Sequence, residues 1–369
     1  MTGFVSERHK RLAPRPSLQS SPRASGRSAA LGGTLAGMLL TAGAAAHHAG
    51  LYDESSVIDV EGEIVAVTWR NPHVRVALDV ATDDGRTSRW ELEGTSVNAL
   101  ERWGVTAADL PVGARMLARG PQSRFGRDTM IAALVRIEGG EPVYLWPNVA
   151  SRLAIADTGI DGLFPPPNIA LTQRPQPTGL FRVWTPRGRP PRDQSLLPLT
   201  ESARLDAARY DALADDPALR CVPAGMPSML DTPYPIEFVD GGDRIVMRFE
   251  EWDGVRTIYM NPRQGPPVQD PSPYGVSFGR WERGGETLAV FTLYIDYPYF
   301  DDLGTPQSGA VSVLERYTPS PDGARLDWEI TVTDAATFTE PIVRGGDMAW
   351  EPGEVIKAFN CALPETPTP

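Results

Sequence analysis

Alternating apolar and polar residues predict a first group of strands near the start of the chain. The predicted elements are strands at 57–69, 74–80 and 89–93, a helix at 96–103, and strands at 114–119 and 130–137. Asn71-Pro72 marks a turn between the first two strands, and Gly104 ends the helix. Three strands, a helix and two strands is the order of a five-stranded OB-type barrel. We therefore expect an OB-like β-barrel domain over residues 47–140.

A second group of strands follows a connector at 141–217 that is dense in proline. Within this connector, the pattern from Leu199 to Leu213 predicts one amphipathic helix with Thr200 at its start. Residues 218–362 then form successive hairpins without a helix between them, which favours an antiparallel β-barrel or a sharply curved sheet. Residues 363–369 are a short tail. The sequence thus predicts a mainly β protein with two domains.

Three turns organise the hairpins of the second domain, at Asp253-Gly254, Gly284-Gly285 and Pro321-Asp322-Gly323. A two-residue turn at the first of these pairs Glu251 with Arg256. The second places Trp281 beside Leu288. These registers put one apolar face of each strand toward the barrel interior.

Several charged residues lie within or beside these apolar strands. The candidate ligand-binding residues are Glu251, Arg256, Arg280, Trp281, Glu315 and Arg316. If the charges point inward, they need partners or a polar ligand, and Arg256→Ala is then expected to weaken ligand binding more than folding. The alternative is that the charges alternate outward to solvent.

The amino terminus has the pattern of a secretory signal. A basic, Ser- and Pro-rich stretch precedes the small, apolar residues 31–46, which predicts cleavage after Ala46 or after Ala44. The apolar run is too short for a spanning helix, so no membrane span is expected once the signal at 1–46 is removed. We expect a soluble periplasmic or secreted protein.

The net charge limits the classes of partner, and the cysteine content bears on the stability of the fold. The chain has a net charge of −12, and the leader carries +5, so the remainder carries about −17, which argues against a nucleic-acid partner. The only two cysteines are Cys221 and Cys361. In an oxidising compartment we expect a disulfide between them, which would close a loop of about 140 residues.

Histidine is confined almost entirely to the start of the expected mature chain. Only four histidines occur, and removal of the leader with His9 leaves His47, His48 and His73. Cleavage after Ala46 would free the amine of His47, which could chelate a metal together with its own ring and with His73, and His48 is an alternative ligand. Three nitrogen ligands suit copper. The alternative is that His47 and His48 are solvated at a frayed terminus and that His73 is a turn residue.

The same stretch resembles a known family. The His47-His48 start, the strand Val60-Glu61-Gly62-Glu63-Ile64 and the motif Trp69-x-Asn71-Pro72-His73 resemble an uncharacterised family of small secreted bacterial proteins, over residues 47–138. Ala49 departs from the family, which often has Ser there. The resemblance implies a location and a fold without a chemistry. More weakly, Gly279-Arg280-Trp281 and an arginine-bearing last hairpin resemble lipocalin-like secreted proteins.

The sequence holds none of the common catalytic signatures, such as Gly-x-Ser-x-Gly or His-Glu-x-x-His. The acidic loop Asp296 to Asp302 lacks the alternating ligands of a calcium loop, so we expect it to be solvated. Our preferred hypothesis is a periplasmic binding protein whose C-terminal barrel holds a small, partly apolar molecule. The alternatives are a protein or enzyme that binds copper or another transition metal, and an interaction module of the cell envelope.

Overall fold

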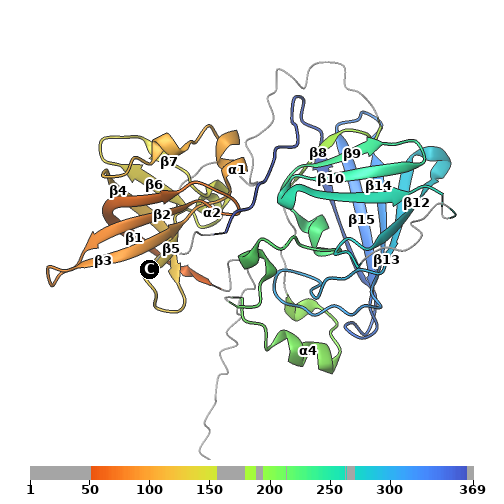
Figure 1. Ribbon diagram of the computed structural model, residues 1–369, viewed down its shortest axis with the longest axis horizontal. Helices are drawn as coiled ribbons and strands as arrows, with labels where there is room; N and C mark the ends of the chain where they lie inside the picture. Colours follow the sequence, from red (N-terminus) through yellow and green to blue (C-terminus); the bar gives the residue numbers. More distant parts are fainter. Residues whose placement is uncertain are drawn as a thin grey trace, which may run out of the picture. The chain divides into compact units, whose positions relative to one another are not determined.

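The computed structural model describes residues 51–155, 179–187, 194–212, 214–261, 263 and 271–363. The predicted signal peptide, with His47 and His48, lies outside the described residues. Figure 1 shows the two sets of strands in the colours of the sequence, orange to yellow for the first and green to blue for the second. Each set forms its own closed barrel.

The amino-terminal barrel has the predicted OB-type topology. Its elements are β1 (Tyr52–Thr68), β2 (Arg75–Ala81), β3 (Thr87–Glu93), α1 (Val97–Arg102), β4 (Arg115–Ser123), β5 (Thr129–Ile131), β6 (Leu134–Ile137), β7 (Pro142–Val143) and α2 (Pro147–Arg152), with a 3-10 turn at Ala107–Asp109. The strand order is β1-β2-β3-β5-β4, and β4 pairs again with β1 to close the barrel. The β3–β5 pair is parallel and the other pairs are antiparallel. The expected OB-like barrel is confirmed.

One expected strand of this barrel is divided. The pattern at 130–137 predicts a single strand, whereas the structure has β5 and β6 with a break at Ala132 and Ala133. At the break, the Ala132 amide donates to the Glu93 carbonyl, and the Ala133 amide donates to the Arg119 carbonyl. The chain therefore changes partner strands within two residues, which a hydrophobic pattern does not reveal.

The alternation of apolar and polar residues along these strands explains why this part of the chain forms a barrel. Val76, Leu78, Leu92 and Met116 are at most 1% exposed and belong to one hydrophobic core, together with Leu100 from α1. Ser96 begins α1 as its N-cap, because its hydroxyl accepts a hydrogen bond from the Ala99 amide. The helix thus starts where its apolar side can cover the barrel core.

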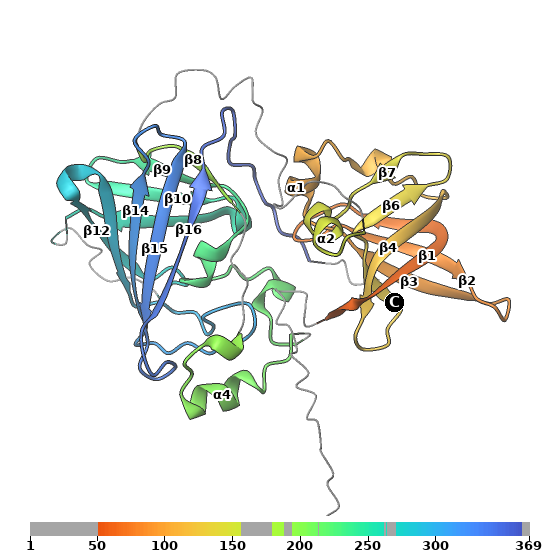
Figure 2. The same cartoon turned by 180° about the vertical axis from the view of Figure 1, so that it is seen from behind.

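The carboxy-terminal barrel is closed by nine strands. They are β8 (Val183–Pro186), β9 (Ile236–Asp240), β10 (Arg244–Phe249), β11 (Gly254–Tyr259), β12 (Val276–Glu282), β13 (Thr287–Leu293), β14 (Ser312–Pro319), β15 (Arg325–Thr333) and β16 (Ile342–Ala349). β9 pairs with both β8 and β10 and so completes the ring. In Figure 2, β14, β15 and β16 run side by side along the barrel wall. The expected barrel is confirmed, with one parallel pair, β11–β12, among antiparallel ones.

The connector contributes more to this barrel than its composition suggests. β8 comes from the proline-rich stretch and pairs with β16 and β9. The predicted helix is present as α4 (Glu201–Ala207), with Thr200 as its N-cap. It ends well before Leu213, and Leu213 itself lies outside the described residues. Shorter 3-10 turns cover Gln194–Leu196, Pro217–Arg220, Ser228–Asp231, Glu251–Asp253 and Arg283–Gly285.

The hairpin between β10 and β11 has a different register from the expected one. Met247, instead of Glu251, stands opposite Arg256, and Phe249 stands opposite Gly254. The cause is the turn, in which Trp252 and Asp253 have φ angles of 62° and 51°. The connection therefore takes four residues, and the expected Glu251–Arg256 pair is wrong. The register of the next hairpin is confirmed, since Trp281 stands opposite Leu288.

The two cysteines form the expected disulfide. Cys221 and Cys361 are bonded across 140 positions, with their Cα atoms 5.8 Å apart. Because so long a loop restricts the unfolded chain, replacing both by serine is expected to lower the free energy of unfolding by roughly 2 to 5 kcal/mol in urea titrations. Thiol titration of unfolded, non-reduced protein is expected to find no free thiol. Two titratable thiols would contradict the bond.

Candidate functional site

Two of the six candidate ligand-binding residues meet inside the C-terminal barrel. Arg256 and Glu315 are 2% and 0% exposed, and both guanidinium Nη atoms donate to the carboxylate, at 2.8 and 2.7 Å. The hydroxyls of Ser277, Thr292 and Tyr317 complete the cluster. Ser277 accepts a hydrogen bond from Arg256, Tyr317 donates one to Glu315, and Thr292 bonds with both. These polar groups satisfy one another, so they need no ligand to neutralise them.

The other four candidates lie away from this cluster. Arg280 and Arg316 both bind Glu282, with N···O distances of 2.6 and 3.1 Å. Trp281 is 41% exposed and its ring contacts that of Phe181. Glu251 belongs to the β10–β11 turn. The barrel interior itself is occupied by a continuous core of buried side chains.

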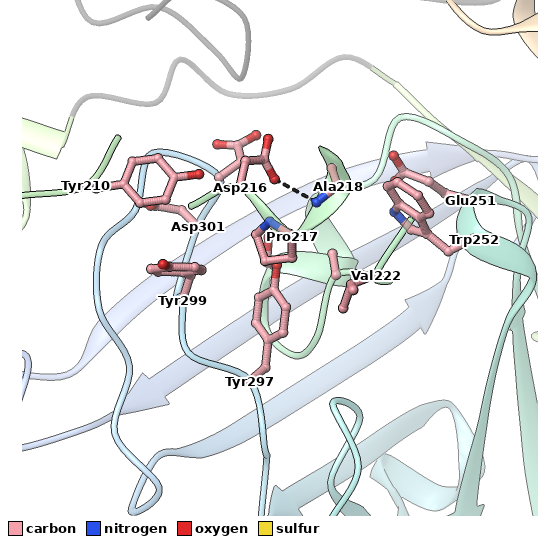
Figure 3. Close-up of a pocket in the computed structure, with 13 residues that line it drawn as sticks. Tyr210, Asp216, Pro217, Ala218, Val222, Glu251, Trp252, Tyr297, Tyr299 and Asp301 are labelled. Atoms are coloured by element: carbon pink, nitrogen blue, oxygen red, sulfur yellow. Dashed lines mark hydrogen bonds between the residues drawn. The ribbon is translucent and has the colours of Figure 1, made fainter. Parts of the chain in front are cut away.

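A pocket lies beside the barrel, where the segment after α4 meets the β13–β14 loop and the β10–β11 turn (Figure 3). Its cavity has a volume of about 20 Å³. The aromatic residues that line it are Tyr210, Trp252, Tyr297 and Tyr299, and the acidic ones are Asp216, Glu251, Asp301 and Asp302. Pro217, Ala218, Val222, Ala224 and Ser228 complete the lining. None of these lining residues is basic.

The β13–β14 loop presents its tyrosines to the pocket because it is locally extended. Tyr297 and Tyr299 are half-buried on either side of exposed Pro298, as expected when alternate residues face one side. The Asp301 carboxylate fixes the loop, since it accepts hydrogen bonds from the Leu303 and Thr305 amides and from the Thr305 hydroxyl. The rings of Tyr299 and Tyr210 meet edge to face at 5.1 Å.

Two short turns form the remaining walls of the pocket. Asp216 caps the 3-10 turn Pro217–Arg220, because its Oδ1 accepts a hydrogen bond from the Ala218 amide at 2.9 Å (Figure 3). The turn with Trp252 is held by Asp253, whose carboxylate accepts hydrogen bonds from the Phe359 and Asn360 amides. The Trp252 and Phe359 rings are 5.3 Å apart. Much of the pocket lining is thus fixed by hydrogen bonds.

Burial and neighbouring carboxylates shift the pKa values of several groups in the pocket lining. Burial raises the pKa of Tyr297, and the charges of Asp216 and Asp302 raise it further. Burial and the charge of Asp216 likewise raise the pKa of Tyr210. Burial also raises the pKa of Asp301, with the neighbouring Asp302 as the next cause. Burial and the neighbouring carboxylates therefore disfavour ionisation of these two phenols and of Asp301.

Gly304 makes room for Tyr210 and provides a test of the pocket wall. Its φ is +79°, and a Cβ there would lie 2.1 Å from the Tyr210 Cγ. We expect Gly304→Ala to lower the free energy of unfolding by about 2 to 4 kcal/mol, from backbone strain and overpacking together. Gly309→Ala in the same loop is the control, because a Cβ there meets nothing within 4 Å. Equal urea midpoints for both variants would contradict this packing.

Sequence reasoning missed a network centred on Asn71, which it treated as a turn residue. Asn71 is 4% exposed, and its Oδ1 accepts a hydrogen bond from the Val97 amide. Its amide nitrogen donates to Asn98 Oδ1 and to the Phe359 carbonyl. Asn71 therefore ties the β1–β2 connection both to α1 and to the segment near Cys361.

The same network continues into the second barrel through a buried carboxylate. Glu250 is 0% exposed and accepts two hydrogen bonds of 2.7 Å from Arg102. It also accepts one from Asn98 Nδ2 and one from the Lys357 amide, both at 3.0 Å. Arg102 binds Glu354 as well, at 2.7 Å. This network connects α1 and Glu250 to residues 354–359. Its polar groups form hydrogen bonds with one another.

His73 is the one predicted metal ligand that falls within the described residues. Its Nδ1 lies 3.2 Å from the Gly94 carbonyl and 3.6 Å from Glu93, and its ring stacks on Trp146 at 5.4 Å. Tyr52 donates a hydrogen bond to the other Glu93 oxygen. Within the described ranges, no three residues of the types His, Cys, Asp and Glu are grouped as a metal site would require.

The fold and the pocket define a two-barrel, all-β protein with an aromatic, acidic cavity beside its second barrel. Residues 36–132 match the model of a family of unknown function (DUF6152). The resemblance to an uncharacterised family is thus confirmed for the amino-terminal part of the chain. Comparison with curated proteins gives no match. No helix in the described part of the chain is both long enough and apolar enough to cross a membrane.

Proposed function

We propose that this protein is an exported binding protein, and that its pocket beside the second barrel holds a small, partly apolar ligand. The observation that carries the proposal is the convergence of four aromatic side chains and several carboxylates on one cavity. Concave sites with aromatic walls and a few polar groups are the usual form of small-molecule sites. The expected signal peptide supports the export part of the proposal.

The pocket suits this role better than the barrel interior. Inside the barrel, Arg256 and Glu315 neutralise each other and apolar side chains fill the remaining core. At the pocket, half-buried rings border a cavity with an opening to solvent. A ligand can therefore enter without disrupting the core of the barrel.

A ligand screen with matched tyrosine variants tests the proposal. The mature chain, residues 47–369, is screened against small metabolites by calorimetry, and each compound that binds is measured again with Tyr299→Ala. We expect the dissociation constant to rise at least tenfold, since the ring is part of the wall. Tyr294→Ala is the control, because Tyr294 is 73% exposed in the same part of the chain and does not line the pocket.

Two further results interpret the screen. Tyr299→Phe keeps the ring and is expected to keep most of the affinity, which separates loss of the wall from loss of folding. Equal affinities for wild type and a folded Tyr299→Ala variant would reject the pocket as the binding site.

The second candidate is a site for copper or another transition metal at the mature amino terminus. The setting of His73 favours it, because an Nδ1–H that donates to the Gly94 carbonyl leaves the lone pair on Nε2, as in metal-binding histidines. In addition, the Tyr52 hydroxyl binds Glu93 beside His73. His47 precedes Tyr52 by five residues, a span of roughly 17 Å when extended.

Amino-terminal sequencing of exported protein is the first test of this candidate, since cleavage after Ala44 would remove the chelating amine of His47. Copper titration then compares the mature chain with His73→Ala. We expect a loss of affinity of at least tenfold in the variant. Equal affinities would exclude His73 as a ligand.

A further inference from the structure

The disulfide joins two segments that are held in the fold in different ways. Cys221 directly follows the 3-10 turn Pro217–Arg220. Residues 217–222, which we call the wall turn, contribute three residues to the lining of the pocket. Cys361 belongs to residues 354–363, which we call the carboxy-terminal strap. The bond is therefore a covalent link between one wall of the pocket and the strap.

The strap is anchored to both barrels by contacts that do not involve the disulfide. The Asp253 carboxylate accepts hydrogen bonds of 2.8 and 2.9 Å from the Phe359 and Asn360 amides. Phe359 is 1% exposed, and its ring packs against that of Trp252. From the first barrel, the Asn71 side chain donates to the Phe359 carbonyl. Because these bonds are charge-assisted or buried, we expect them to hold the strap after reduction of the disulfide.

The wall turn has only local hydrogen bonds. The amides of Leu219, Cys221 and Val222 donate to carbonyls of residues 216–218, as in a short helical turn. In the described part of the chain, every hydrogen bond of the wall turn joins residues between 214 and 222. Leu219 and Val222 are 42% and 44% exposed, so they bury little apolar surface. Of the two segments, the wall turn therefore depends more on the disulfide for its position.

We propose that the disulfide is a redox-sensitive latch on the pocket, and that its reduction frees the wall turn while the strap stays docked. This inference rests on the proposed ligand-binding function and adds a means of regulating the same pocket. Cys221 and Cys361 are both half-buried, so part of the bond faces solvent and a small dithiol can reach it.

Reduction by a dithiol follows thiol–disulfide exchange. A thiolate of the dithiol attacks one sulfur of the protein disulfide and forms a mixed disulfide, and the other cysteine leaves as a thiolate that takes up a proton. The second thiol of the dithiol loses its proton and displaces the remaining cysteine, which is protonated in turn. Two electrons and two protons thus pass from the dithiol to Cys221 and Cys361, and the dithiol becomes a disulfide.

Hydrogen exchange measured by mass spectrometry tests the latch without a ligand. The mature chain, residues 47–369, is compared before and after reduction with dithiothreitol, and circular dichroism monitors the fold. We expect exchange of the three wall-turn amides to rise at least tenfold, because the turn can then open without moving the strap. The amides of Phe359 and Asn360, which donate to Asp253, are expected to change less than twofold.

A variant without the disulfide gives an independent comparison in the absence of reductant. The double substitution Cys221→Ser, Cys361→Ser is expected to show the same pattern as the reduced protein, with fast exchange in the wall turn and slow exchange in the strap. This agreement would exclude an effect of dithiothreitol itself.

Three results would overturn the latch. They are unchanged exchange of the wall turn in fully reduced protein, an equal rise in the strap, and loss of the circular dichroism signal of the barrels on reduction. None of them depends on the ligand screen. A screen without a Tyr299-dependent ligand, together with faster exchange of the reduced wall turn, would reject the binding function and leave the latch standing.

Discussion

Arg256→Ala is expected to lower the free energy of unfolding by about 3 to 5 kcal/mol. The variant would leave the Glu315 carboxylate buried at 0% exposure without its cationic partner. Removal of one member of a buried ion pair typically costs this much, because the remaining charge is desolvated and uncompensated. Urea unfolding followed by circular dichroism measures the change.

Two comparisons make this result specific. Arg280→Ala removes an exposed arginine that also binds a glutamate, and we expect a change below about 1 kcal/mol. The double variant Arg256→Met, Glu315→Leu removes both charges and is expected to regain most of the lost stability. If Arg256→Ala were as stable as Arg280→Ala, the buried pair would be refuted.

This expectation revises the one drawn from the sequence, in which Arg256→Ala affects ligand binding more than folding. The revision follows from the identity of the partner. A rim pair with Glu251 would be solvated, whereas the observed pair with Glu315 is inside the core of the barrel. Arg256 therefore belongs to the barrel's own stability.

Glu250→Ala is expected to lower the free energy of unfolding by about 3 kcal/mol, at the lower end of the range for buried pairs. The variant removes the carboxylate that binds Arg102, Asn98 and the Lys357 amide, but Arg102 keeps its contact with Glu354. Urea unfolding measures the midpoint and the slope. A second transition would indicate that the two barrels no longer unfold together.

Glu101→Ala is the matched control for Glu250→Ala. Glu101 also pairs with a residue of the carboxy-terminal segment, Lys357, at 3.3 Å, but its side chain is 48% exposed. We expect a loss below about 1 kcal/mol. Equal losses for the two glutamates would contradict the view that burial makes Glu250 important.

The hydrophobic pattern was sufficient for most of the fold. Alternation of apolar and polar residues predicted strands of both barrels. The helix predicted at 96–103, between the third and fourth strands, identified the OB-type order of the first barrel. Glycine turns gave the correct register at Trp281 and Leu288. The pattern failed at Trp252 and Asp253, because their positive φ angles are rare for such residues and leave no signal in composition.

The candidate site was harder to predict, because its parts are distant in sequence. Tyr297 and Tyr299 lie in the acidic loop from Asp296 to Asp302, which the sequence predicts to be solvated. Tyr210 and Trp252 come from two other segments, and only the folded chain brings the four rings together. The spacing of Tyr297 and Tyr299, on either side of Pro298, was the one local signal that both rings face the same side of the loop. The proposed metal ligands His47 and His48 lie outside the described residues.

The contacts of residues 354–363 imply an order in which the parts of the chain become complete. The chain runs through the whole second barrel before it reaches the segment that satisfies Asn71, Asn98 and Arg102. Arg70 also donates to the Leu363 carbonyl, and Cys361 closes the disulfide. A partly folded chain can therefore form its first sheet and still expose these polar groups to water. A chain that stops before residue 354 would leave these groups without their carboxy-terminal partners.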